Sequence, residues 1–214
     1  MFKSGRTISF GWALLLVSII YAVGIIGFLL PEWNAIIKAA TPLNILFCTI
    51  ILGLFHRHFS RDFILWVLMV AFGGWLIEVA GVATGVLFGE YLYGDNLGPK
   101  VFGVPIMMAI NWLMLTYMAA DISSRLKQGI WLKSAVGASL MVAYDFLLEP
   151  IAIHFNMWIW AQTEIPLQNY LAWYVFGFLF QILFHRFIKH SQNQMVIPVL
   201  LSQIAFFIVV HLTK

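Results

Sequence analysis

Residues 62–88 read DFILWVLMVAFGGWLIEVAGVATGVLF. After Asp62 this run contains no Lys or Arg, and Glu78 is the one charged side chain within it. A helix needs about 20 predominantly apolar residues to cross the ~30 Å hydrocarbon core of a bilayer. The run therefore predicts a membrane-spanning helix that carries a carboxylate at membrane depth.

The rest of the chain has the same apolar character. Of its 214 residues, 62% are hydrophobic and 10% are charged, and the mean hydropathy is +0.92. Because soluble domains carry about 25% charged residues, this composition excludes the soluble globular class. The net charge of +3 comes from basic residues scattered in short clusters between apolar runs, which does not favour nucleic-acid binding. The single cysteine, Cys48, excludes an intramolecular disulfide and a thiolate metal cluster.

The apolar runs predict an all-α, polytopic transmembrane helical bundle that forms a single membrane domain, residues 1–214. We expect about seven spans, near residues 8–30, 36–55, 62–88, 101–120, 131–153, 168–188 and 194–212. Basic residues concentrate in cytoplasmic loops, and here they fall nine to three on alternate sides of the spans. The nine are Lys3, Arg6, Arg57, Arg61, Arg125, Lys127, Lys133, Arg186 and Lys189; the three are Lys38, Lys100 and Lys214. This distribution predicts a cytoplasmic N-terminus, with residues 1–30 kept as a first span rather than removed as a signal peptide.

Three acidic residues are predicted to lie at membrane depth: Glu78, Asp145 and Glu149. Counted from the inner helix edges, they lie roughly 24, 21 and 27 Å from the cytoplasmic side at a rise of 1.5 Å per residue. An ionisable group there costs at least about 2.5–3.5 kcal/mol and is a functional candidate. Asp145 and Glu149 are four residues apart and share a helix face. Because two like charges cannot both ionise cheaply there, we expect the pair to share a proton and to act as acid and base.

Further aromatic and amide residues are expected near these acids. They are Trp75, Tyr91, Tyr93, Asn111, Trp112, Trp158, Trp160, Asn169 and Trp173. The tryptophans within the spans lie deeper than an interfacial belt requires and can hold a carbocation by cation–π attraction, about 0.5–2 kcal/mol each. The tyrosines and tryptophans of the outward loops lie above the acids. The alternative is that the amides join neighbouring helices and the aromatic residues form an ordinary interfacial belt.

A faint internal repeat relates residues 62–120 to residues 131–188. Pro105 precedes Trp112 by seven residues, and Pro166 precedes Trp173 by the same interval. Before each proline an outward loop contains a pair of aromatic residues, and the preceding span carries a carboxylate. The two segments are therefore candidates for parallel copies of one unit; coincidence is the alternative interpretation.

Several of these motifs resemble a known family. The stretch 78–93, EVAGVATGVLFGEYLY, is similar to a segment of the membrane carotenoid-biosynthesis family that includes the CruF-type carotenoid 1,2-hydratases. So are GVP at 103–105 with NW at 111–112, and DFLLEP at 145–150 with WIW at 158–160. The resemblance covers the third to sixth spans and departs at 164–166, where EIP stands in place of a second GVP.

The resemblance implies a multi-pass enzyme of a bacterial or archaeal cell (inner) membrane. It would add water across the terminal C1–C2 double bond of a linear (psi) carotenoid end group, with a lipophilic carotenoid from the bilayer as substrate. Glu78, Asp145 and Glu149 would be catalytic, and the aromatic and amide residues given above would bind substrate. No metal or other cofactor is implied, and other carotenoid-pathway enzymes are possible partners.

Three other functions stay open on the sequence. A lycopene-cyclase-like isomerase would form the same cation but quench it with a neighbouring double bond. A proton-coupled transporter would use the three acids as a proton relay. A carotenoid-binding scaffold would hold the polyene without changing it.

Overall fold

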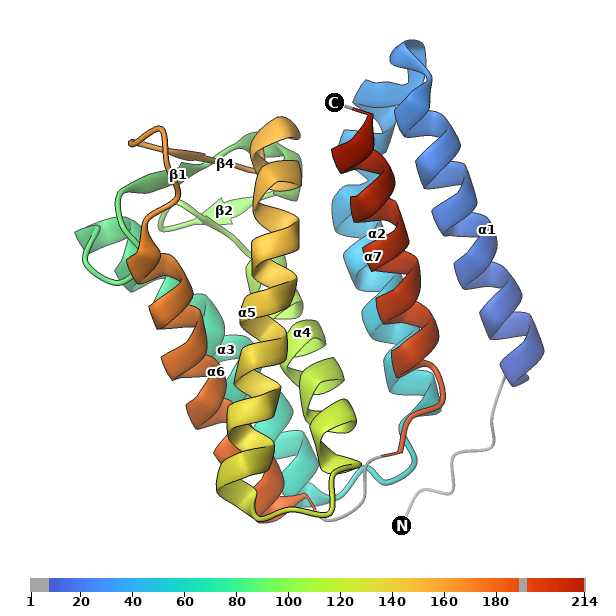
Figure 1. Cartoon of the computed structure of the whole chain (residues 1–214), viewed down its shortest axis with the longest axis vertical. Helices are drawn as coiled ribbons and strands as arrows, with labels where there is room; N and C mark the ends of the chain where they lie inside the picture. The colour runs from blue at the N-terminus through green and yellow to red at the C-terminus, as the bar shows by residue number, and fades with distance from the viewer. Residues whose placement is uncertain (1–7, 189–191, 214) are drawn as a thin grey trace.

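The computed structural model describes residues 8–188 and 192–213. Within these residues seven α-helices run alternately up and down (Figure 1). They are α1 (Phe10–Leu29), α2 (Asn34–Phe55), α3 (Arg61–Thr84), α4 (Met107–Ser124), α5 (Ile130–His154), α6 (Leu167–Phe187) and α7 (Val196–Leu212). Short strands and 3-10 turns connect them: η1 (Pro31–Trp33), β1 (Tyr91–Tyr93), η2 (Asp95–Leu97), β2 (Lys100–Val101), β3 (Val104–Pro105) and β4 (Trp158–Trp160).

The helices confirm an integral membrane protein with an all-α bundle. Five segments are long and apolar enough to cross a membrane: Phe10–Leu29, Pro31–Phe55, Arg61–Thr84, Ile130–His154 and Leu167–Phe187. The shorter Val196–Leu212 is also apolar. The remaining helix, α4, buries most of its side chains, including the polar Asn111, Thr116 and Asp121. Its position between α2, α3, α5 and α6 explains why it carries more polar residues than a lipid-facing helix.

The bundle consists of two groups of helices. α3, α4, α5 and α6 pack against one another, and α1, α2 and α7 lie along one side of this group, where α2 contacts α4 and α7 contacts α5 (Figure 1). Lipid-facing helices expose large apolar side chains on their outer faces, as at Leu68 and Phe72 of α3. The bundle therefore has apolar side chains on its outer surface, where they face lipid, and in its interior, where the helices pack together.

Two predicted helix ends were wrong. The span predicted over 62–88 ends at Thr84, because Gly85 adopts a left-handed backbone (φ 66°) and its N–H closes the helix on Gly81 O at 2.8 Å. The span predicted over 101–120 begins at Met107 instead, because β2 and β3 form a hairpin. Its turn has positive φ at Phe102 and Gly103. Asn111 therefore lies about one turn into α4 rather than nearly three.

An antiparallel pair of strands caps one end of the bundle. β1, which follows α3, pairs with β4, which follows α5, so that Tyr91 lies opposite Trp160 and Tyr93 opposite Trp158. Figure 1 shows this pair at the end of the bundle where α7 ends. The strand pair thus joins two loops that are more than 60 residues apart in the chain and fixes the aromatic side chains over the ends of α3 and α5.

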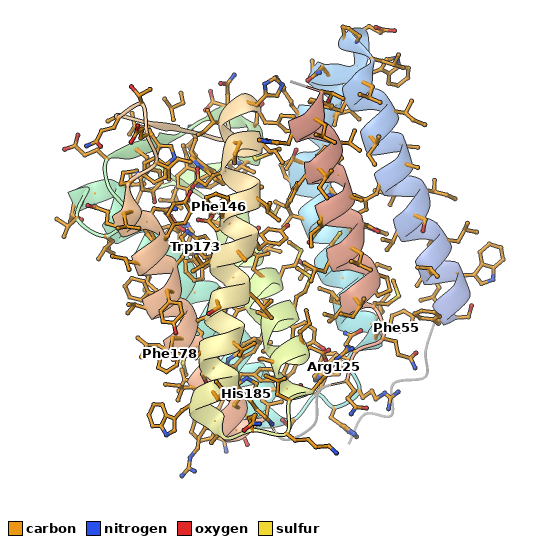
Figure 2. The ribbon with its side chains drawn as sticks, viewed as in Figure 1. Phe55, Arg125, Phe146, Trp173, Phe178 and His185 are labelled. Atoms are coloured by element: carbon orange, nitrogen blue, oxygen red, sulfur yellow. The ribbon has the colours of Figure 1, made fainter. Side chains whose placement is uncertain are left out.

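The opposite end of the bundle carries the buried carboxylate Asp121, which accepts a hydrogen bond and forms an ion pair with Arg125 at 2.8 Å. Figure 2 shows Arg125 and His185 at this end. Of the basic residues used to predict the orientation, Lys3, Arg6, Lys189 and Lys214 lie outside the described residues. The cytoplasmic placement of the N-terminus stays a prediction.

Candidate active site

Glu78 lies near the end of α3, beneath β1. Its side chain is 3% exposed and accepts three hydrogen bonds. The hydroxyls of Tyr91 and Tyr93 donate to Oε2 at 2.5 and 2.8 Å. The indole Nε1 of Trp112, on α4, donates to Oε1 at 2.8 Å. One carboxylate therefore ties together α3, β1 and α4.

Glu149 has a matching position near the end of α5, beneath β4. The indole nitrogens of Trp158 and Trp160 both donate to its Oε2 at 3.0 Å. The amide nitrogen of Asn169, on α6, donates to Asp145 Oδ2 at 2.9 Å and to Glu149 Oε1 at 3.3 Å. Asn169 thus bridges the two carboxyls that the sequence places one helix turn apart, and both are 1% exposed.

The three carboxyls surround a small cavity of about 20 Å³, here called the carboxylate cavity. A cavity needs roughly 10–15 Å³ of this kind of space to hold one water molecule. The lining residues are Glu78, Phe88, Tyr91, Tyr93, Met108, Asp145, Glu149, Trp158, Trp160, Asn169 and Trp173. The site therefore has room for one water molecule next to three carboxyl groups.

Trp173, which lines the carboxylate cavity, stacks on Trp112. The rings of Trp112 and Trp173 lie 4.1 Å apart and almost parallel, at 4°. Trp173 points between α5 and α6 in the half of the bundle nearer the strands (Figure 2). Gly74 permits this packing, because a Cβ at position 74 would lie 2.5 Å from Cγ of Trp112. Aromatic faces are thus held rigidly beside the acids.

A much larger cavity of about 300 Å³, here called the apolar cavity, lies between the two groups of helices. Side chains of α1, α2, α4, α5 and α7 line it, and most of them are apolar. Met108 and Trp158 line both cavities. These two side chains therefore place the apolar cavity next to the carboxylate cavity.

Most of the predicted site residues come together. The three acids, four loop aromatics, Asn169 and Trp173 line the carboxylate cavity, and Trp112 contacts Glu78 from below. Asn111 instead lines the apolar cavity. Trp75 lies against Phe72 and Phe102, on a different face of α3, and is not among the lining residues of either cavity. Its role in substrate binding stays a prediction.

Sequence reasoning missed Phe88 and Met108 in this site. Phe88 folds back under the end of α3, where a Cβ on Gly81 would lie 2.5 Å from its ring. The two glycines spaced four residues apart, Gly81 and Gly85, could have indicated this close approach. Met108 occupies the position three residues after Pro105, as Asn169 follows Pro166, but nothing in its chemistry distinguishes it from core methionines.

The charges around the site are arranged without a cation. The ion pairs of the described residues, Lys100–Asp95 and Arg125–Asp121, both lie elsewhere. Burial and the neighbouring Glu78 raise the pKa of Tyr91 and of Tyr93 well above the usual value, so both hydroxyls keep their protons. In residues 8–188 and 192–213, no group of three His, Cys, Asp or Glu side chains is arranged to hold a metal ion. Cofactor independence stays a prediction.

Comparisons with known proteins show the family of this chain. A segment of 119 residues is 29% identical to bisanhydrobacterioruberin hydratase of Haloarcula japonica. It covers 50% of this chain and 40% of that relative's length. No solved structure matches the chain. A family model described as carotenoid biosynthesis protein matches residues 40–214, and the chain therefore belongs to that family.

Proposed function

We propose that this chain is an enzyme that hydrates the terminal C1–C2 double bond of a linear carotenoid end group. The observation that carries the proposal is the water-sized cavity enclosed by Glu78, Asp145 and Glu149 and adjoining an apolar chamber. Hydration of an isolated alkene needs a proton donor, a carboxylate and a water molecule, kept apart from bulk solvent. Membership in a carotenoid biosynthesis family and a relative named as a hydratase support the same reaction.

The apolar cavity is the proposed seat of the polyene end. Along α5 its lining runs from Tyr144 to Phe155, roughly 16 Å at the helical rise. This length suits one end of a rod-like carotenoid, with the remainder of the polyene in the lipid. Met108 has a flexible, unbranched side chain, and its movement would open the way from the apolar cavity to the carboxyls. Substrate would thus enter from the bilayer of the cell membrane.

The hydrogen bonds suggest different protonation states for the three acids. Glu149 faces only N–H groups, which can donate but not accept, so its environment suits a carboxylate anion. Asp145 receives one N–H donor, on Oδ2, which leaves its other oxygen able to carry a proton. Glu78 faces two tyrosine hydroxyls, which can donate to a carboxylate or turn and accept from a carboxylic acid, so Glu78 can change its protonation state while both tyrosines keep their protons.

These states assign the steps of the proposed reaction. Asp145 gives its proton to C2, and the electron pair of the double bond forms the new C–H bond, which leaves a tertiary cation at C1. Anionic Glu149 and the face of Trp173 stabilise that cation. A water molecule in the carboxylate cavity adds its oxygen to C1 and releases a proton to Glu78, and proton transfer among the carboxyls restores Asp145. The net change is one added water, with no oxidation or reduction.

The test is turnover by the purified full chain in lipid nanodiscs. Lycopene is incubated in water enriched in oxygen-18, and products are analysed by mass spectrometry. We expect a product heavier by one labelled water, with the label in a tertiary hydroxyl. A product of unchanged mass would replace the hydratase with a cyclising isomerase. Unchanged lycopene, together with uptake of a solute into liposomes that depends on a proton gradient, would favour a transporter.

A further inference from the structure

The apolar cavity contains a polar group that the proposed reaction does not use. Gln203, on α7, lines this cavity and is 4% exposed. Its Oε1 is buried and has no hydrogen-bond partner, and its Nε2 contacts only the sulfur of Met114, at 3.7 Å. A buried amide without partners costs about 1–3 kcal/mol. The group is therefore placed where a polar atom of a ligand can satisfy it.

A second amide faces the same space from α4. Asn111 lines the apolar cavity, is 5% exposed, and makes no side-chain hydrogen bond within the described residues. It lies three residues before Met114 and therefore on the same face of α4 as the sulfur that Gln203 contacts. Other polar lining residues satisfy one another: Asn44 donates to the hydroxyl of Tyr21 at 3.1 Å. The unpaired Oε1 of Gln203 and the amide of Asn111 thus enter one apolar chamber from two neighbouring helices.

We propose that Gln203 and Asn111 form a subsite for a hydroxyl group on the polyene. This inference rests on the proposed function, since it takes a polyene as the occupant of the apolar cavity. A hydroxyl both donates and accepts, so it can satisfy an amide oxygen and an amide nitrogen together. A polyene without oxygen leaves both amides unpaired. The site therefore selects oxygenated substrates over pure hydrocarbons.

The position of the subsite restricts which hydroxyl it can bind. Met108 borders the carboxylate cavity, and Met114 contacts Gln203; six residues of α4 separate them, roughly 9 Å. A C40 polyene is several times longer than this distance. The hydroxyl bound at Gln203 therefore belongs to the same end of the polyene as the double bond that reaches the acids.

The test compares binding of two linear C40 polyenes that both keep the terminal C1–C2 double bond and differ by one hydroxyl on the same end of the polyene. Binding to the full chain in nanodiscs is followed by quenching of tryptophan fluorescence. We expect the wild type to prefer the hydroxylated polyene by about 3- to 10-fold, roughly the gain from one net hydrogen bond. Gln203→Leu should remove the preference by weakening binding of the hydroxylated polyene alone. Without bound polyene, the Gln203→Leu variant should be at least as heat-stable as the wild type.

Gln181→Leu is the matched control. Gln181, on α6, is also buried with an unpartnered Oε1, but it packs against Gly137 and is not among the lining residues of the apolar cavity. Its substitution should leave the preference intact. An unchanged preference in Gln203→Leu, or equal binding of both polyenes by the wild type, would overturn the subsite even if lycopene is hydrated. A preference that depends on Gln203 without any hydrated product would overturn the proposed reaction and support the subsite.

Discussion

The ends of α3 and α5 hold Glu78 and Glu149 beneath paired strands in the same way, but with different chemistry. The aromatic residues of β1 bind Glu78 through hydroxyl groups, whereas those of β4 bind Glu149 through indole N–H groups. Tryptophan N–H can only donate, and tyrosine O–H can donate and accept. The Glu149 end is therefore suited to a fixed anion, and the Glu78 end to a carboxyl that can be either charged or protonated.

The residues at matching positions around the two carboxylates also differ: those near Glu78 are small or apolar, and those near Glu149 are polar. Four residues before Glu78 stands Gly74, against which Trp112 packs; four residues before Glu149 stands Asp145. Three residues after Pro105 stands Met108, which borders the apolar cavity, and three residues after Pro166 stands Asn169, which bridges the acids. One half of the site thus holds a closely packed indole, and the other half carries the second acid. Whether the halves are copies of one unit stays a prediction.

The largest expected effect is the loss of hydration rate when either carboxyl of α5 is replaced by an amide. Asp145→Asn should lower the hydration rate by at least about 100-fold, because an amide cannot protonate the alkene and general acids contribute about 10²- to 10⁴-fold. Glu149→Gln should cost as much, because the cation loses its anion. Initial rates of product formation, with polyene binding measured in parallel, provide the check. Asp95→Asn, which changes an exposed carboxylate of η2, is the control and should keep the wild-type rate. Full turnover in both α5 variants would refute the acid assignment.

The next largest expected effect is a difference in stability between the variants Glu149→Gln and Glu78→Gln. Glu149→Gln puts an amide NH₂ among N–H donors, so one buried donor is left unpaired at a cost of about 1–3 kcal/mol. Glu78→Gln can direct its NH₂ to the tyrosine oxygens, so it should lose less. Thermal unfolding of both variants in the same detergent measures the difference. Equal losses would mean that the tyrosine hydroxyls do not accept, and the proposed uptake of a proton by Glu78 would fail.

Much of this site was predictable from the sequence. The three acids stand out because charged groups inside apolar runs are costly, and helical rise alone places them at one level. The contacts between β1 and β4 were not predictable, because three-residue strands carry too little pattern to identify a partner more than 60 residues away. Trp75 was expected beside Glu78, but the face of α3 that meets α4 is the one containing Gly74. The rotation of a helix with apolar residues on all sides is set by packing rather than by its own pattern.

The indole stack depends on glycine in the α3 half. Gly74→Ala would bring a Cβ to 2.5 Å from Trp112 and push the indole away from Glu78. Overpacking of this kind costs about 1–3 kcal/mol, and the hydration rate should fall with it. Gly73→Ala is the neighbouring control, because its Cβ would meet only the ring edge of Phe180 at 3.3 Å. Unfolding and rate measurements on both variants test the packing, and equal behaviour would show that the stack is not a constraint.

The smallest expected effect is on the loss of stability at alkaline pH. It distinguishes the tyrosine hydroxyls around Glu78 from the indoles around Glu149. Tyrosines of the unfolded chain ionise near pH 10, but burial and Glu78 raise the pKa of Tyr91 and Tyr93 in the folded protein. The folded state then keeps protons that the unfolded state releases, so stability should be complete below pH ~10 and fall as the pH rises further. Replacing both residues by Phe should flatten this decline. Trp158→Phe removes a donor from Glu149 without removing an ionising group, so it should leave the slope unchanged. Melting temperatures measured from roughly pH 8 to 11 test the contrast, and parallel slopes in the wild type and the double Phe variant would contradict it.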